Sequence, residues 1–274
     1  MVAVAVLLAF DRLSALAVRG RPVGLAELDD LTRGLLPGAL WVVLGASGVG
    51  KTVLACQFAA GAAETGADTA LILGREPAST AAANMVCARG RVADQRLRSG
   101  RLSPAETDRA RRAADEVASW PLRVLTPQDR EWELSKSTSV PDLDHWLAPG
   151  AMGTRRVADV LVVDDLDLLT TRTLPGVLPV LRAWAKASGQ VIVVTLPEEP
   201  WVAGGVLSPV VRREADVAVR LRRWDLHNAG SARGGEAELQ VLGHREGPVS
   251  AVAVAFEGHF RRFADLRTPQ VNPR

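Results

Sequence analysis

An apolar run, a glycine-rich loop and a helix-prone run follow one another within residues 39–60, and they constrain the fold more than any other segment. Residues 39–44 read Ala-Leu-Trp-Val-Val-Leu, which is long enough for one buried strand. Residues 53–60 have helical spacing and propensity. The residues between these runs match the pattern G-x-x-x-x-G-K-[ST]: Gly45, Ala46, Ser47, Gly48, Val49, Gly50, Lys51 and Thr52. A strand, this loop and a helix in that order predict a phosphate-binding loop, and disfavour a chance match by a glycine-rich turn.

The residue types of the loop suit a triphosphate and its metal ion. Glycines let the backbone curl so that successive N–H groups point at phosphate oxygens. The N-terminus of the next helix adds the positive end of its dipole. In such loops the lysine, here Lys51, reaches the β and γ phosphates, and the hydroxyl of Thr52 ligates Mg²⁺.

Composition narrows the class of protein. The chain has 274 residues, 47% of them hydrophobic, and a net charge of +2, so no overall basic field forces a nucleic-acid interpretation. Cys56 and Cys87 are too few for a disulfide framework and fit reduced thiols in the cytoplasm. Residues 1–10 are wholly apolar, but no basic residue precedes them and the run is too short to span a bilayer. We expect a helix over residues 1–18 that packs on something, such as a neighbouring subunit, and no membrane association.

Apolar runs alternate with helical patterns along the chain, which predicts an α/β fold with a mainly parallel sheet wrapped by helices. Later short strands, separated by turns, would extend that sheet with antiparallel hairpins. A capping box at Ser103 and Glu106, with proline between them, predicts the start of one helix. Residues 126–138 are polar and irregular. The expected strands are 39–44, 69–73, 157–163, 191–195, 217–221, 239–242, 249–256 and 259–263, and the expected helices are 25–31, 78–88, 104–118 and 174–187.

A phosphate-loop site also needs a carboxylate from a neighbouring strand, because that carboxylate helps to coordinate the metal ion. The best candidate is Asp164, which directly follows the apolar run Val-Leu-Val-Val at residues 160–163. This order is the Walker B arrangement. Asp165 and Asp167 follow closely, and we interpret them as solvated loop charges.

Two further residues are candidates for the hydrolysis step. Glu76 lies just past the second expected strand, where a carboxylate could orient the attacking water, although an exposed turn residue beside Pro77 is an equal alternative. Arg245 lies in a turn between two late strands. There it could act as an arginine finger on a nucleotide bound by the next subunit, or be a surface charge.

Several segments in order resemble the ATPase domain of DnaB-type replicative helicases. The resemblance covers about residues 20–267 and rests on segments 22–38, 45–52, 74–76, 96–103, 162–168, 215–217, 245–248 and 256–266. It implies a RecA-like fold, ATP with Mg²⁺, a hexameric ring around single-stranded DNA, and replication partners. Lys51, Thr52 and Asp164 would then bind nucleotide and metal, Glu76 would activate water, and Arg245 would be the finger. Residues 1–19 would be a subunit-linking element, 20–267 the ATPase domain and 268–274 a tail.

The chain also departs from that family. Gly243 stands where the family has a lysine, Leu196 replaces a glutamine thought to sense the γ-phosphate, and the DNA-gripping loop is shortened to residues 207–213. Two hypotheses follow: a DNA-coupled ATPase whose Arg212 and Arg213 grip phosphates, or an ATP-binding regulatory or assembly module without helicase activity. A recombination or clock-type RecA-like ATPase is a third, which the ending at residues 257–263 disfavours.

Overall fold

A computed structural model describes residues 19–126, 157–170, 172–226 and 231–266. Three expected segments lie outside these ranges: the helix at residues 1–18, the irregular stretch at 126–138 apart from Thr126, and the tail at 268–274. Among the described residues, no helix combines the length and the hydropathy that crossing a bilayer requires.

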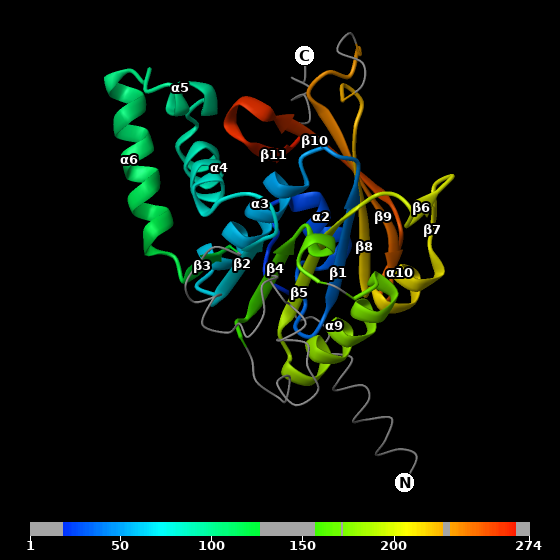
Figure 1. The fold of residues 1–274 in the computed structure, drawn as a ribbon. Helices are drawn as coiled ribbons and strands as arrows, with labels where there is room; N and C mark the ends of the chain where they lie inside the picture. The colour runs from blue at the N-terminus through cyan, green and yellow to red at the C-terminus, as the bar shows by residue number, and fades with distance from the viewer. Residues whose placement is uncertain (1–18, 127–156, 171, 227–230, 267–274) are drawn as a thin grey trace, which may run out of the picture.

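One large sheet organises the fold (Figure 1), in the order β11-β10-β9-β8-β1-β5-β4-β2-β3. The strands from β8 to β3 are parallel to one another, and β9, β10 and β11 continue the sheet in antiparallel fashion. The predicted α/β class with a late antiparallel extension is therefore confirmed. The strands are β1 (Leu40–Gly45), β2 (Thr69–Leu73), β3 (Leu122–Leu125), β4 (Val160–Asp164), β5 (Val191–Pro197), β8 (Val217–Arg223), β9 (Glu236–His244), β10 (Ala251–Glu257) and β11 (Arg262–Asp265).

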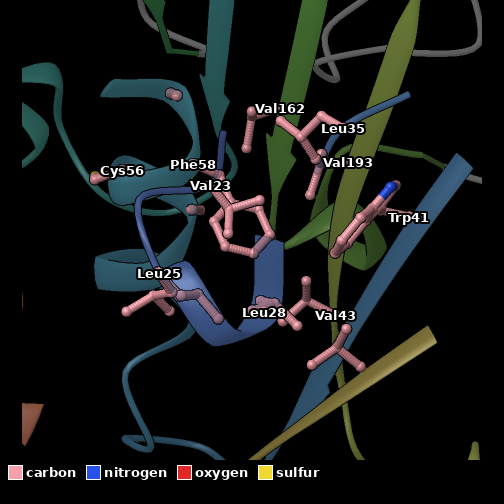
Figure 2. Close-up of a cluster of buried hydrophobic side chains, with 14 of the residues drawn as sticks. Val23, Leu25, Leu28, Leu35, Trp41, Val43, Cys56, Phe58, Val162 and Val193 are labelled. Atoms are coloured by element: carbon pink, nitrogen blue, oxygen red, sulfur yellow. The ribbon is translucent and has the colours of Figure 1, made fainter. Parts of the chain in front are cut away.

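Helices cover both faces of this sheet, which is why its central strands are apolar on both sides. Alternate residues of each strand point to opposite faces, so Trp41 and Val43 join one core and Leu40 and Val42 join the other. In the first core Trp41 packs edge-on against Phe58, with ring centroids 5.9 Å apart (Figure 2). The first face carries α2 (Ala26–Thr32), α3 (Lys51–Glu64) and α4 (Ala78–Gly90), with α5 (Asp94–Arg98) and α6 (Pro104–Ser119) beyond α4, and the second carries α9 (Leu174–Ser188) and α10 (Pro209–Glu214).

Most expected elements form at or near the predicted residues, and the box that opens α6 makes both of its reciprocal hydrogen bonds. The strand predicted at 259–263 is wrong in its first half. A 3₁₀ turn, η3 (Gly258–Phe260), and Arg261 at φ 54° intervene before β11 begins. A left-handed residue cannot continue an extended strand, so the chain turns back there. The short elements β3, α5, α10 and the hairpin of β6 (Val202–Ala203) with β7 (Val206–Leu207) were not predicted.

Candidate nucleotide-binding site

The glycine loop joins the carboxyl end of β1 to the first turn of α3, as the sequence predicted. Gly50 precedes the helix at φ 111°, a conformation that side chains rarely adopt. A Cβ on Gly50 would also lie only 3.0 Å from the ring of Phe263. Glycine is therefore required here both by the backbone and by its close neighbour. The loop leads into a 14-residue helix, whose first N–H groups have no partner within the helix and can bind an anion.

Lys51 is the first residue of α3, and its side chain turns back over the loop. The Nζ atom donates to the carbonyl oxygens of Gly45, at 3.0 Å, and Ala46, at 3.3 Å. The ammonium group thus lies at the mouth of the loop, where a bound anion would find a positive charge.

Asp164 ends β4 with its carboxylate turned toward α3. The side chain is only 1% exposed, and its carboxylate interacts with the hydroxyl groups of Thr52 and Thr195. Burial raises the pKa of Asp164 to about 6, and the hydrogen bonds from Thr195 and Thr52 oppose that rise. Within the described parts of the chain, this carboxylate has no arginine or lysine at ion-pair distance.

Glu76 borders the same cavity as the loop. Its Oε2 atom accepts a hydrogen bond from Thr80 Oγ1 at 3.3 Å, which ties it to the first turn of α4. The cavity has a volume of about 590 Å³. It is lined by Ser47, Gly48, Gly50, Lys51, Thr52, Val53, Arg75, Glu76, Thr80, Asn84, Arg98, Asp165, Asp167, Pro197 and Arg261. Asp165 and Asp167, expected to be solvated loop charges, thus lie at its rim, with Asp165 paired to Arg75 at 3.6 Å.

Arg245 lies away from the glycine loop and the cavity beside it. It follows β9 and contacts the start of β8, where its Nε donates to Asp216 Oδ1 at 3.0 Å and its Nη2 donates to the carbonyl of Arg213 at 2.6 Å. Trp41 pairs with Val217 at this edge of the sheet, whereas the glycine loop begins four residues later, at Gly45. At about 3.3 Å per residue, Arg245 is more than about 10 Å from the loop of its own chain.

Arg212 and Arg213 lie on α10, just before β8, and therefore at the same edge as Arg245. Both side chains are exposed. The guanidinium of Arg213 pairs with Glu214 at 2.6 Å, and its carbonyl also accepts from Arg182.

Thr195 is the residue of the site that sequence reasoning missed. It lies on β5, between β1 and β4, and is fully buried. Its hydroxyl donates to Asp164 Oδ1 at 2.6 Å and accepts from the backbone N–H of Asp165 at 2.9 Å. A single hydroxyl inside the apolar run of residues 191–197 was the available signal.

A glycine loop on a central parallel strand, opposed by a buried carboxylate two strands away, is the arrangement of a RecA-like P-loop fold. The chain belongs to the family of the DnaB-like helicase C terminal domain, whose model matches residues 20–173. The predicted family is therefore confirmed.

Named relatives agree with this family. The chain is 27% identical over 270 residues to the replicative DNA helicase DnaB of Leifsonia xyli subsp. xyli, and 23% identical over 263 residues to that of Geobacillus stearothermophilus. Each match covers 91% of this chain and 57% of the relative, so the chain spans little more than half the length of these proteins.

Two solved structures share the fold, each with a TM-score of 0.78 and 17% identity. One is described as an ATPase domain, and the match covers 97% of this chain and 99% of that one. The other is a DnaB-like replicative helicase studied with its interactions with primase, and the match covers 96% of this chain and 66% of that one.

Proposed function

We propose that this chain is the motor domain of a DnaB-like helicase, which binds Mg-ATP, hydrolyses it and couples hydrolysis to movement on single-stranded DNA in a ring-shaped oligomer. The observation that carries the proposal is the arrangement around the 590 Å³ cavity, with Lys51, Thr52 and Glu76 on its wall and Asp164 in contact with Thr52. The relatives named as replicative DNA helicases supply the DNA-coupled part of the proposal.

Each residue has a task that its position supports. The N–H groups of the loop and the Lys51 ammonium would bind the β and γ phosphates. Glu76, held by Thr80, would take the proton of the attacking water. We expect these groups to serve ATP in the cytoplasm, the compartment that two buried free thiols fit.

The residues present also fit Mg²⁺. Asp164 is a buried carboxylate with no arginine or lysine at ion-pair distance in the described chain, and it contacts the Thr52 hydroxyl. One carboxylate and one hydroxyl, completed by phosphate oxygens and water, are the ligands that Mg²⁺ prefers in nucleotide sites. The ion, when bound, would neutralise charge on the phosphates.

Arg245 would act on a nucleotide held by another copy of the chain. Its distance from its own loop excludes a role in cis, and its bond to Asp216 holds it at the opposite edge of the sheet. A ring of copies, which we propose to be hexameric, would bring that edge to the neighbouring cavity.

A second candidate function is an ATP-binding regulatory or assembly module that does not move on DNA. The residue directly after Thr195 is Leu196, whose side chain is apolar and fully buried and so cannot hydrogen-bond the γ-phosphate. The connection from β5 to β8, residues 198–216, has only two basic residues, Arg212 and Arg213, and the guanidinium of Arg213 pairs with Glu214. Two arginines, one of them paired, offer few contacts to a phosphate backbone.

The two candidates differ in their response to DNA. The test is ATP turnover of the full chain at low salt, with and without a single-stranded oligonucleotide, combined with light scattering in the presence of an ATP analogue. A motor predicts faster turnover and an oligomer that captures the oligonucleotide. Glu76→Gln is the control that should remove hydrolysis while leaving assembly intact. If the oligonucleotide changes neither ATP turnover nor assembly, the motor function is refuted and the regulatory or assembly module is favoured.

A further inference from the structure

Thr195 is an isolated polar residue in a strand whose packing does not need it. Strand β5 reads Val-Ile-Val-Val-Thr-Leu-Pro, and Thr195 is 0% exposed. Valine has nearly the same shape and would fill the same space between β1 and β4. Burying a hydroxyl without hydrogen-bond partners costs about 1–3 kcal/mol of folding free energy. We therefore expect this threonine to be needed for the hydrogen bonds that it makes.

The two hydrogen bonds of Thr195 have a fixed direction. The backbone N–H of Asp165 can only donate, so Thr195 Oγ1 accepts that bond at 2.9 Å. The single hydroxyl proton is then directed to Asp164 Oδ1, at 2.6 Å. A distance this short between oxygens is typical of a hydrogen bond to a charged carboxylate.

These bonds hold the start of the turn that follows β4. Asp165 has φ 52°, a left-handed conformation that needs support outside glycine. The turn also lies tightly against the end of β2, because Gly74 N–H donates to the Asp164 carbonyl at 3.0 Å and a Cβ on Gly74 would lie 2.8 Å from the Asp165 carbonyl. Thr195 braces this turn from the β5 side, opposite Gly74.

We propose that Thr195 is a positioning residue for the metal site: its hydroxyl occupies one oxygen of Asp164 and so turns the other oxygen toward Thr52 and the metal–nucleotide complex. This inference rests on the proposed function, because it assigns Asp164 to the metal ion. Hydrogen-bonded partners of metal ligands orient them in this way, and their loss weakens metal affinity about 10–100-fold.

The test compares Thr195→Val with Thr195→Ser. Thr69→Val is the matched control, since Thr69 is also a fully buried threonine in a parallel strand. It lies at the amino end of β2, and its hydroxyl donates to the Ala67 carbonyl rather than to a carboxylate. Two quantities are measured on the full chain: Mn²⁺ binding with ADP present, by electron paramagnetic resonance, and the affinity for a fluorescent ADP analogue in EDTA.

We expect Thr195→Val to weaken Mn²⁺ binding about 10–100-fold and to leave metal-free nucleotide binding unchanged. Thr195→Ser keeps the hydroxyl and should recover most of the Mn²⁺ affinity, and Thr69→Val should behave as wild type. Wild-type Mn²⁺ affinity in Thr195→Val, or an equal loss in Thr69→Val, would overturn the positioning role alone. A wild-type protein that binds neither nucleotide nor Mn²⁺ would overturn the proposed function as well.

Discussion

Replacement of Asp164 by asparagine should stabilise the free protein while damaging its site. The carboxyl group is almost fully buried, and burial is the main reason why its pKa rises from 3.8 to about 6. Asparagine has the same shape and no charge, and its carbonyl can still accept the bond from Thr195. The amide nitrogen is a donor, and the Thr52 hydroxyl can rotate to accept from it, so the variant mainly removes the cost of a buried charge.

The size and the sign of the effect follow from the two pKa values. Each pH unit between the folded and unfolded pKa corresponds to 1.36 kcal/mol, so ionising Asp164 costs the folded protein roughly 3 kcal/mol. Below about pH 3.8 both states are protonated and the group costs nothing. The cost grows as the pH rises toward about 6 and is complete above that value. Asp164→Asn should thus be more stable than wild type by up to about 3 kcal/mol at pH 8, and by much less near pH 4.

Urea unfolding at several pH values measures this difference, and thermal unfolding should show a gain of roughly 5–10 °C at pH 8. Asp167→Asn is the control, because Asp167 follows closely but is exposed. Added nucleotide and Mg²⁺ should narrow or reverse the gap, since only wild type gains from the metal. A variant that is less stable than wild type at pH 8 without ligand, or a gap independent of pH, would refute the reasoning.

Three other substitutions test the site and the fold. Lys51→Ala should abolish binding of a fluorescent nucleotide analogue, because the positive charge at the loop mouth is lost; normal affinity would remove Lys51 from the site. Arg245→Ala should lower turnover about 10³-fold or more without changing nucleotide affinity, and mixing it with Lys51→Ala protein should restore part of the turnover; mixtures as inactive as their components would contradict action between subunits. Ser103→Ala removes the capping box of α6 and should lower the free energy of unfolding in urea by about 1 kcal/mol, whereas an unchanged midpoint would show that the cap is idle.

Much of the site could be predicted because it depends on local patterns. The glycine loop needs only its own residues and the two elements beside it. Asp164 and Glu76 each follow an apolar run, and parallel strands bring their carboxyl ends to one edge of the sheet. Chain order and strand direction were therefore enough to predict that Asp164 and Glu76 lie at the edge of the sheet where the glycine loop begins.

Thr195 could not be assigned by the same reasoning. Its role depends on β5 lying between β1 and β4, and the order of strands in a sheet differs from their order in the chain. The short elements were missed for a related reason. A two-residue strand such as β6 or a six-residue helix such as α10 has too few residues to show a period, and tertiary contacts decide its conformation.

The position of Arg245 in the fold is a stronger argument than its sequence motif for a site that is completed only when copies of the chain assemble. The glycine loop begins at the carboxyl edge of the parallel strands, and Arg245 is hydrogen-bonded to Asp216 at the amino edge of β8. A rigid sheet separates the two edges, and no movement of the turn that carries Arg245 can carry it across five residues of packed strand. If Arg245 takes part in hydrolysis, the complete site must be made by two copies of the chain. Turnover that depends on Arg245 would then be a measure of assembly, and an isolated copy would bind nucleotide without hydrolysing it efficiently.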